Sequence, residues 1–148
     1  MRALLQRVAE ASVEVDGERI AAIGAGLLVL VAAGAGDDER GARRVAGKIA
    51  RLRIFADDRG RMNRSVADTG GEVLVVSQFT LYADVSRGNR PGLTGAAEAG
   101  LAQQLVDTVA DELRTLGLPV QTGRFGAHMR VALVNDGPVT IWIDNGGH

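Results

Sequence analysis

Two short polar segments carry residue types that can bind or cleave an ester. Ser77-Gln78-Phe79-Thr80 follows an apolar run at residues 73–76, and Asn135-Asp136-Gly137-Pro138 separates two further apolar stretches. Hydroxyl and amide groups at the end of a buried strand can line a pocket for an acyl group, and neighbouring backbone N–H groups can face a developing oxyanion. Polar residues are also routine at strand ends, so the first segment alone fits a structural role equally well.

The second segment has the composition of a turn, because Asn, Asp, Gly and Pro are the usual turn residues. Pro138 has no backbone donor and must therefore lie at the start or the edge of a strand. An X-Pro bond is also the one place where a cis peptide is cheap, at ~0.5–1 kcal/mol. Gly137-Pro138 can thus present carbonyl oxygens rigidly to a ligand with no side chain in the way.

The composition removes several other kinds of chemistry. The chain has no cysteine, which excludes disulfides, thiolate catalysis and cysteine-based metal sites. Its two histidines are His128 and His148, so a histidine-rich metal site cannot be built and a Ser-His-Asp triad would have to use one of the two. We therefore expect no metal, no cofactor and a reaction that proceeds without the usual proton carrier.

Length and hydropathy indicate one globular domain, residues 1–148, with 46% apolar and 24% charged residues. No apolar run approaches the ~18 residues that span a bilayer. Arg2 and Arg7 interrupt the N-terminal segment too early for the core of a signal peptide. These features predict a cytoplasmic protein with no membrane partner.

The charge is unevenly distributed, although the net charge is only −1. Residues 40–64 contain nine of the seventeen cations and two acidic residues, Asp57 and Asp58. A solvated helix face is the ordinary interpretation of such a run. A patch that faces phosphates is the alternative, and the sequence leaves both open.

Hydrophobic patterning predicts strands at residues 4–15, 20–23, 27–33, 72–79, 119–121, 129–134 and 139–143. Apolar positions at spacings of three and four predict helices at residues 42–52, after the acidic Asp37-Asp38-Glu39, and 96–116. Hairpin signals such as Asp16-Gly17 favour an antiparallel or mixed sheet over a doubly wound one. The fold class is therefore α+β with two main helices.

Over nearly its whole length the chain resembles the D-aminoacyl-tRNA deacylase family, and the matching motifs occur in that family's order. The strongest matches are Arg7-Val8, Gly26-Leu27-Leu28-Val29-Leu30, Leu74-Val75-Val76-Ser77-Gln78-Phe79-Thr80-Leu81, Phe125-Gly126-Ala127 and Leu133-Val134-Asn135-Asp136-Gly137-Pro138-Val139-Thr140. One departure follows Arg90-Pro91, where the family commonly has Ser-Phe and this chain has Gly92-Leu93.

The resemblance implies a compact, barrel-like α+β domain that forms a symmetric homodimer with its active sites at the subunit interface. The implied reaction is hydrolysis of the ester of D-aminoacyl-tRNA, and of glycyl-tRNA mischarged on tRNA(Ala), with rejection of L-aminoacyl groups. Gly137 and Pro138 would form a cis element that enters the partner's site and sterically excludes an L side chain. The residues implied at the site are Ser77, Gln78, Phe79 and Thr80, with Phe125 and Met129 in the pocket and Arg7 supporting the Gly-Pro element.

The mechanism that we expect does not depend on an enzyme nucleophile. Thr80 has no evident base in the sequence to activate it, so we favour attack by water, with backbone amides at the oxyanion and a ribose hydroxyl of the tRNA assisting. Two alternatives remain at this point. One is a non-catalytic dimeric tRNA-binding module that uses residues 40–64, and the other is a hydrolase of a different small acyl ester.

Overall fold

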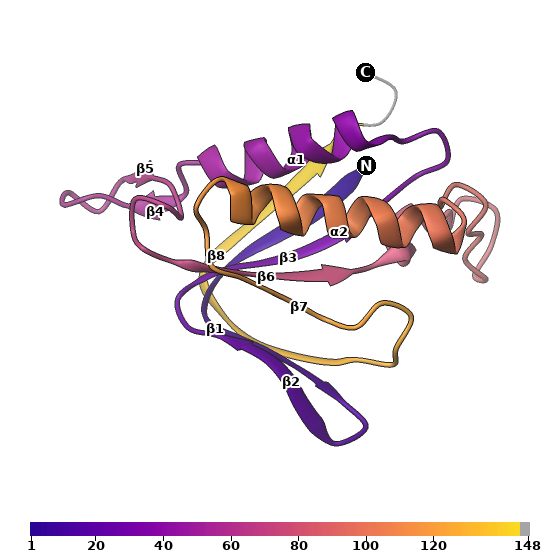
Figure 1. Ribbon diagram of the computed structural model, residues 1–148, viewed down its shortest axis with the longest axis horizontal. Coiled ribbons are helices and arrows are strands. Elements are labelled where there is room, and N and C mark those ends of the chain that lie inside the picture. Colours follow the sequence, from indigo (N-terminus) through magenta and orange to yellow (C-terminus); the bar gives the residue numbers. More distant parts are fainter. Residues whose placement is uncertain (146–148) are drawn as a thin grey trace.

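The computed structural model describes residues 1–145, in which two helices cover one face of a strongly curved, nearly closed sheet (Figure 1). The elements in chain order are β1 (Arg2–Val15), β2 (Glu18–Ile23), β3 (Gly26–Ala32), α1 (Glu39–Arg51), β4 (Phe55–Ala56), β5 (Met62–Arg64), β6 (Glu72–Ser77), the 3-10 helix η1 (Phe79–Tyr82), α2 (Ala99–Thr115), β7 (Val120–Thr122) and β8 (Arg130–Asp144). Within residues 1–145, no helix is long and apolar enough to cross a membrane.

The main sheet is mixed, as the hairpin signals predicted. The long strand β1 pairs antiparallel with β2, β3 and β8, whereas β3, β6 and β7 run parallel to one another. Parallel neighbours need a crossover connection, and the two helices supply it: α1 lies between β3 and β6 in the chain, and α2 between β6 and β7. The α+β class with two main helices is therefore confirmed.

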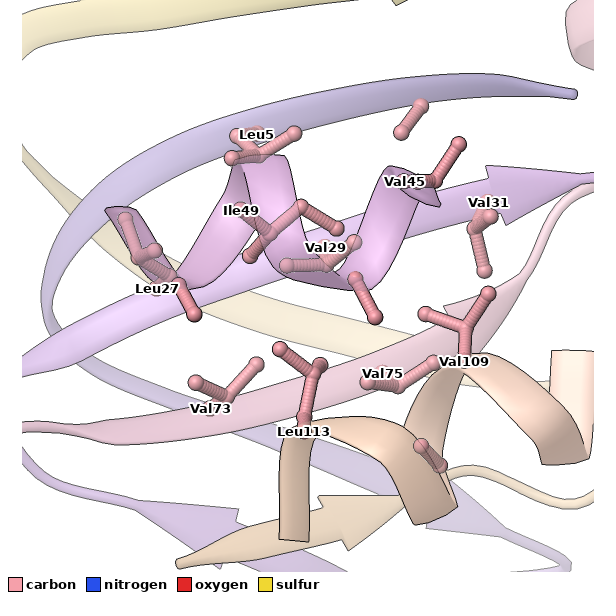
Figure 2. Close-up of a cluster of buried hydrophobic side chains, with 14 of the residues drawn as sticks. Leu5, Leu27, Val29, Val31, Val45, Ile49, Val73, Val75, Val109 and Leu113 are labelled. Carbon is pink, nitrogen blue, oxygen red and sulfur yellow. The ribbon is translucent and has the colours of Figure 1, made fainter. Parts of the chain in front are cut away.

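Alternation along the strands builds two separate cores. On β3, Leu27, Val29 and Val31 face the helices, while Leu28 faces the inside of the curved sheet. The helix-facing core joins β1, β3 and β6 to both helices (Figure 2); its labelled members are Leu5, Leu27, Val29, Val31, Val45, Ile49, Val73, Val75, Val109 and Leu113. Because β3 and β6 are buried on both faces, their sequences are continuous apolar runs and do not alternate with polar residues.

Both helices begin at an acidic cap. The Asp38 carboxylate accepts a hydrogen bond of 2.9 Å from the Gly41 N–H at the start of α1. In α2 the cap is Glu98, whose carboxylate accepts from the N–H groups of Gly100 and Leu101. These bonds satisfy donors that the first turn leaves without a partner. The second helix therefore begins three residues later than the apolar stripe alone predicted.

Two predicted elements differ from the structure. The strand predicted at residues 72–79 ends at Ser77, and the chain then turns into η1. The turn predicted at residues 135–138 is wrong, because β8 continues along β1 without reversing. The register moves from Gln6 opposite Thr140 to Val8 opposite Asn135, so residues 136–139 bulge out of the strand beside Arg7.

The hairpin formed by β4 and β5 was not predicted. Its strands are only two and three residues long, too short to show an alternating pattern. In Figure 1 this hairpin projects beyond the sheet, next to the C-terminal end of α1. We refer to it below as the arm.

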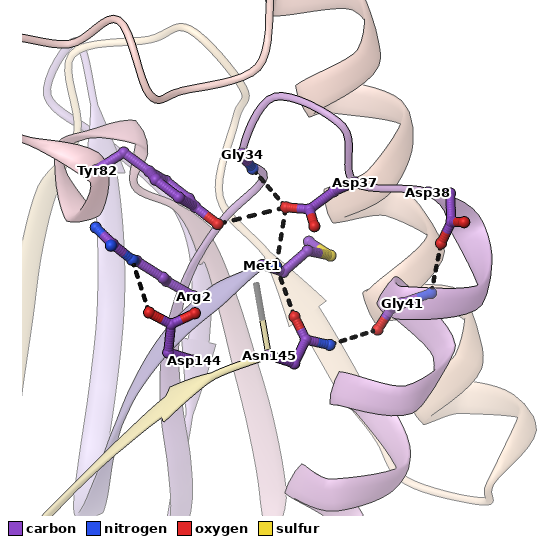
Figure 3. A network of polar contacts seen from close by, with 9 residues as sticks. All are labelled: Met1, Arg2, Gly34, Asp37, Asp38, Gly41, Tyr82, Asp144 and Asn145. Carbon is purple, nitrogen blue, oxygen red and sulfur yellow. Dashed lines mark hydrogen bonds and ion pairs between the residues drawn. The ribbon is translucent and has the colours of Figure 1, made fainter. Parts of the chain in front are cut away.

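A buried network holds the amino group of Met1 and the start of β1 in place (Figure 3). The Met1 ammonium forms an ion pair of 2.8 Å with Asp37 and donates a hydrogen bond of 2.6 Å to the Oδ1 of Asn145. The same Asp37 oxygen accepts from the Gly34 N–H at 2.6 Å and from the Tyr82 hydroxyl at 3.3 Å. Since Tyr82 is the last residue of η1, the network also fixes the helix that carries Phe79 and Thr80.

Candidate functional site

A pocket of about 540 Å³ opens where the sheet fails to close. Among residues 1–145, β7 pairs with β6 only at residues 73–75 and β8 pairs only with β1, so the end of β6 has a ladder with β3 on one edge and none on the other. The pocket has the size of a site for a small organic group. Its lining is Val76, Ser77, Gln78, Phe79, Leu93, Ala96, Ala97, Ala99, Ala102, Phe125, Gly126, Ala127, His128, Met129 and Val131.

The first polar segment forms one wall of this pocket. Ser77 and Gln78 are half-buried, whereas the Phe79 side chain is 54% exposed at the mouth. The backbone N–H of Gln78 donates to the Val31 carbonyl at 2.9 Å and fixes the segment to the end of β3. An exposed aromatic ring beside two polar side chains can stack on a planar group while the polar atoms hold its substituent.

Two backbone donors are free at the start of η1. The N–H groups of Phe79 and Thr80 donate to no other residue in the part of the chain that the structure describes. The next amide along, that of Leu81, already donates to the Gln78 carbonyl. Adjacent free N–H groups at the mouth of a pocket can stabilise negative charge that develops on a bound carbonyl oxygen.

Thr80 lies beside the pocket but not in its lining. Its side chain is exposed, and its hydroxyl accepts a hydrogen bond from the Gln78 side-chain amide. Among residues 1–145, no carboxylate or imidazole forms a hydrogen bond with this hydroxyl. An amide donor cannot remove a proton, so the arrangement gives Thr80 no general base.

The opposite wall contains Phe125 and Met129, which are both half-buried. It also contains His128, which we did not expect, because composition alone had led us to a site without histidine. Its place next to Met129 in the chain is the signal that was missed. His128 forms no hydrogen bond or ion pair with another described residue, so it is not part of a triad. His148 lies outside the described residues.

The second polar segment lies elsewhere on the molecule. The Gly137-Pro138 peptide bond is cis, both residues are exposed, and neither lines the pocket of its own chain. A β-carbon on Gly137 would lie 2.0 Å from the Val139 nitrogen, which is a backbone atom that cannot give way. Only glycine therefore fits residue 137 in this conformation.

Two side chains brace the Gly-Pro bulge. The Asn135 amide donates to the carbonyl oxygens of Arg7 at 2.9 Å and Val139 at 3.3 Å. The Arg7 guanidinium donates to the Asp136 carbonyl at 2.8 Å and to the Ile54 carbonyl at 2.7 Å. Arg7 thus connects the bulge to the segment that follows α1, and its side chain is only 16% exposed.

Tyr82 is a neutral donor under all ordinary conditions. Its burial raises the pKa of the phenol far above the usual value, and the neighbouring negative charge of Asp37 raises this pKa further. The Arg2 guanidinium lies 4.4 Å from the centre of the Tyr82 ring. These contacts hold η1 against β1 and so help to fix the position of the free N–H groups.

At the departure from the family pattern, Gly92 pairs with Asp84 through two backbone hydrogen bonds, and Leu93 lines the pocket. The mouth therefore carries an aliphatic side chain at this position. Within residues 1–145, no group of three or more histidine, aspartate or glutamate side chains is arranged to hold a metal ion.

Comparison with known proteins gives concordant matches. The family model described as D-Tyr-tRNA(Tyr) deacylase matches residues 4–144. A protein named D-aminoacyl-tRNA deacylase from Thermomicrobium roseum is 61% identical over 145 residues, 98% of this chain and 94% of that protein. A protein of the same name from Roseiflexus sp. is 62% identical over 145 residues, again 98% of this chain and 94% of that protein. A solved structure titled "c-Myc DNA Unwinding Element Binding Protein" superposes with a TM-score of 0.94 at 39% identity, covering 99% of this chain and 100% of that chain.

Proposed function

Because the chain belongs to the D-Tyr-tRNA(Tyr) deacylase family and hydrolyses the ester bond of D-aminoacyl-tRNA, we propose that the pocket at the end of β6 holds the aminoacyl group and the 3′-terminal adenosine. Ser77 and Gln78 supply polar contacts to the ester. Phe79 supplies an exposed ring on which the adenine base stacks. Phe125 and Met129 form the apolar wall opposite.

The reaction is attack of water on the acyl carbon of the ester. The water oxygen bonds to the carbonyl carbon, the bond from that carbon to the ribose oxygen breaks, and a proton from the water ends on the ribose oxygen. The products are a free amino acid and deacylated tRNA. The tetrahedral intermediate carries its negative charge on the former carbonyl oxygen, where the free N–H groups of Phe79 and Thr80 can donate to it.

No enzyme nucleophile takes part in this proposal. The support for it is the environment of Thr80, whose hydroxyl meets only the Gln78 amide and no base. The vicinal hydroxyl of the terminal ribose lies next to the ester by covalent geometry; it can orient the water and relay a proton, accepting one from the water as it passes its own to the leaving ribose oxygen. The enzyme then contributes positioning and oxyanion stabilisation, which together account for large rate enhancements without a side-chain nucleophile.

The Gly-Pro bulge is proposed to act in a second subunit of a symmetric homodimer. The support is that Gly137 and Pro138 are exposed, braced by Arg7 and Asn135, and absent from the pocket of their own chain. Carbonyl oxygens held there would occupy the space of an L side chain while leaving that of a D side chain open. A glycyl group has no side chain to exclude, so glycyl-tRNA mischarged on tRNA(Ala) is proposed as a further substrate. The proposed site of action is the cytoplasm.

The observation that carries this proposal is the pair of free N–H groups at the mouth of a pocket where, among residues 1–145, no hydroxyl is hydrogen-bonded to a carboxylate or an imidazole. The test is to incubate the protein with the same tRNA carrying either the D- or the L-form of one amino acid and to measure free amino acid. We expect release from the D-form and none above background from the L-form. Equal release from both would disprove the chiral selection, and no release from either would favour a tRNA-binding module without catalysis.

A further inference from the structure

The chain separates charge strongly between the segment that forms α1 and the arm and all the other residues. Residues 40–64 hold nine cations and two acidic residues, whereas the remaining residues hold eight cations and sixteen acidic residues. The segment thus has a net charge of +7 and the remainder one of −8. Residues 40–64 comprise most of α1 and the arm, which lie together in Figure 1. A field of this kind attracts a polyanion to one side of the molecule.

Four arginines converge on a groove between the two helices. The groove has a volume of about 340 Å³ and is lined by Arg40, Arg43, Arg44, Gly47 and Arg51 from α1, by Glu112 from α2, and by Leu116 directly after α2. We call these four arginines the α1 strip. Arg43 lies 3.4 Å from Glu39, while the other three form no ion pair with a residue that the structure describes. All four side chains belong to exposed residues.

The shape of α1 favours this convergence. Positions 40, 44, 47 and 51 follow one another at helical spacings and share one face. The third of these is Gly47, and the Arg51 guanidinium nitrogen lies only 3.0 Å from where a β-carbon on it would be. Arg51 therefore folds back along the helix toward Gly47 and the groove, while it stays exposed.

The strip is not needed to hold the fold. The packing of α1 rests on its opposite, apolar face, where Val45 and Ile49 are fully buried. Like charges four residues apart, such as Arg40 and Arg44, weaken a helix and do not stabilise it. A bound anion would remove this repulsion, so the arrangement is better explained by a partner than by stability.

We propose that the α1 strip binds backbone phosphates of the tRNA acceptor stem; this rests on the proposed function and assigns a second contact to the same substrate. Helix α2 links the two sites, because Ala102 lines the pocket and Glu112 lines the groove. Ten residues of helix span about 15 Å. Stacked nucleotides rise about 3.4 Å each along one strand, so this separation corresponds to only a handful of them. A tRNA whose 3′ end enters the pocket has its first base pairs at that range.

The test compares two substrates that share the reacting ester. One is full-length D-aminoacyl-tRNA, and the other is the D-aminoacyl ester of adenosine alone. For the triple variant Arg40→Gln/Arg44→Gln/Arg51→Gln we expect kcat/KM on the tRNA to fall roughly tenfold, and the slope of log affinity for deacylated tRNA against log salt to become shallower by about 2 to 3. On the adenosine ester kcat/KM should not change. Arg19→Gln, an exposed arginine on β2, is the matched control and should alter neither value.

Each other outcome has a defined meaning. Equal loss on both substrates, or unchanged activity on the tRNA, would overturn the role of the strip while the proposed function stands. A wild-type protein that hydrolyses neither substrate would overturn the proposed function. The salt dependence of its affinity for deacylated tRNA, compared with that of the triple variant, would still show whether the α1 strip binds phosphates. If the triple variant does not fold, the single variant Arg44→Gln, checked by thermal melting, should reduce the salt slope by about 1.

Discussion

A β-carbon on residue 123 would lie 2.6 Å from the Sδ atom of Met129, so the sulfur occupies space that only glycine leaves free. Gly123 also donates its N–H to the Val75 carbonyl at 3.0 Å, which fixes it against β6. The position of Met129 in the pocket wall is therefore set by a residue that does not line the pocket itself. Sequence patterning gives no indication of such a contact.

For Gly123→Ala we expect Met129 to be displaced into the pocket, because the backbone of residue 123 cannot retreat from β6. KM for D-aminoacyl-tRNA should rise several-fold, while the protein should lose less than about 1.5 kcal/mol of stability, because the methionine side chain is flexible and can shift. Steady-state kinetics and urea unfolding measure the two effects. If the contact is the cause, adding Met129→Ala should cost less stability in the Gly123→Ala background than in the wild type.

For Arg7→Lys we expect a large loss of activity with little loss of stability. A lysine ammonium cannot reach the carbonyl oxygens of Asp136 and Ile54 at once with the fork geometry of a guanidinium. The Gly-Pro bulge would then be free to move, and a displacement near 1 Å can cost about 100-fold in rate. The D-to-L selectivity should fall together with kcat/KM. Arg19→Lys serves as the control; an unchanged selectivity in Arg7→Lys would contradict the bracing role.

For Asp37→Asn we expect a loss of about 2 to 4 kcal/mol in the free energy of unfolding, because the buried Met1 ammonium loses its ionic partner. Urea denaturation measures it. The neighbouring Asp38 provides the control, since Asn caps a helix as well as Asp does, and Asp38→Asn should stay within about 0.5 kcal/mol of wild type. Similar losses in the two variants would show that the ammonium is not the cause.

For Thr80→Ala we expect less than a tenfold fall in kcat. Among residues 1–145, the hydroxyl accepts a hydrogen bond from the Gln78 side-chain amide and has no general base beside it to activate it. Quenched reactions of the wild type, analysed by intact-mass spectrometry, should contain no acyl adduct on the protein. Loss of all activity in Thr80→Ala, together with a trapped adduct on Thr80 in the wild type, would establish a covalent mechanism instead.

The arm should loosen in acid. Hydrogen bonds from the backbone N–H groups of Arg61 and Arg59 lower the pKa of the Asp57 carboxyl below its ordinary value. A carboxyl whose pKa is lower in the folded state stabilises the fold above its unfolded pKa, and this contribution is lost as the pH falls through the folded pKa. An NMR titration should place the Asp57 midpoint below that of an unperturbed aspartate. The protection factors of the amides of residues 59 and 61, measured against intrinsic exchange at the same pH, should fall below that midpoint, and an ordinary midpoint would contradict the hydrogen-bond assignment.

Much of the scaffold could be predicted because its causes are local. The buried strands β3 and β6 are continuous apolar runs, and α1 follows its acidic cap at Asp38. The mixed sheet follows from hairpin signals near the N-terminus combined with two long helical crossovers. These features depend on residues close together in the chain, where spacing and residue type are sufficient.

The features that could not be predicted depend on distant contacts. Turn-forming residues at 135–138 indicate an irregular backbone but not whether the chain reverses, and the continued pairing of β8 with β1 decides that. His128 enters the pocket only because the loop before β8 lies against the end of β6. The role of Arg7 depends on Asp136 and Ile54, which are far from it in the chain.

The missing ladder between β7 and β8 has a mechanical consequence. Among residues 1–145, no strand ladder joins β7 to β8, and the connection between them is fixed to β6 through the hydrogen bond from the Gly123 N–H to the Val75 carbonyl. Beyond that bond, the width of the opening depends on the twist accumulated across the strands from β6 through β3 and β1 to β8. A substitution that changes the coiling of β1, on the far side of the sheet, would widen or narrow the pocket without touching any residue that lines it.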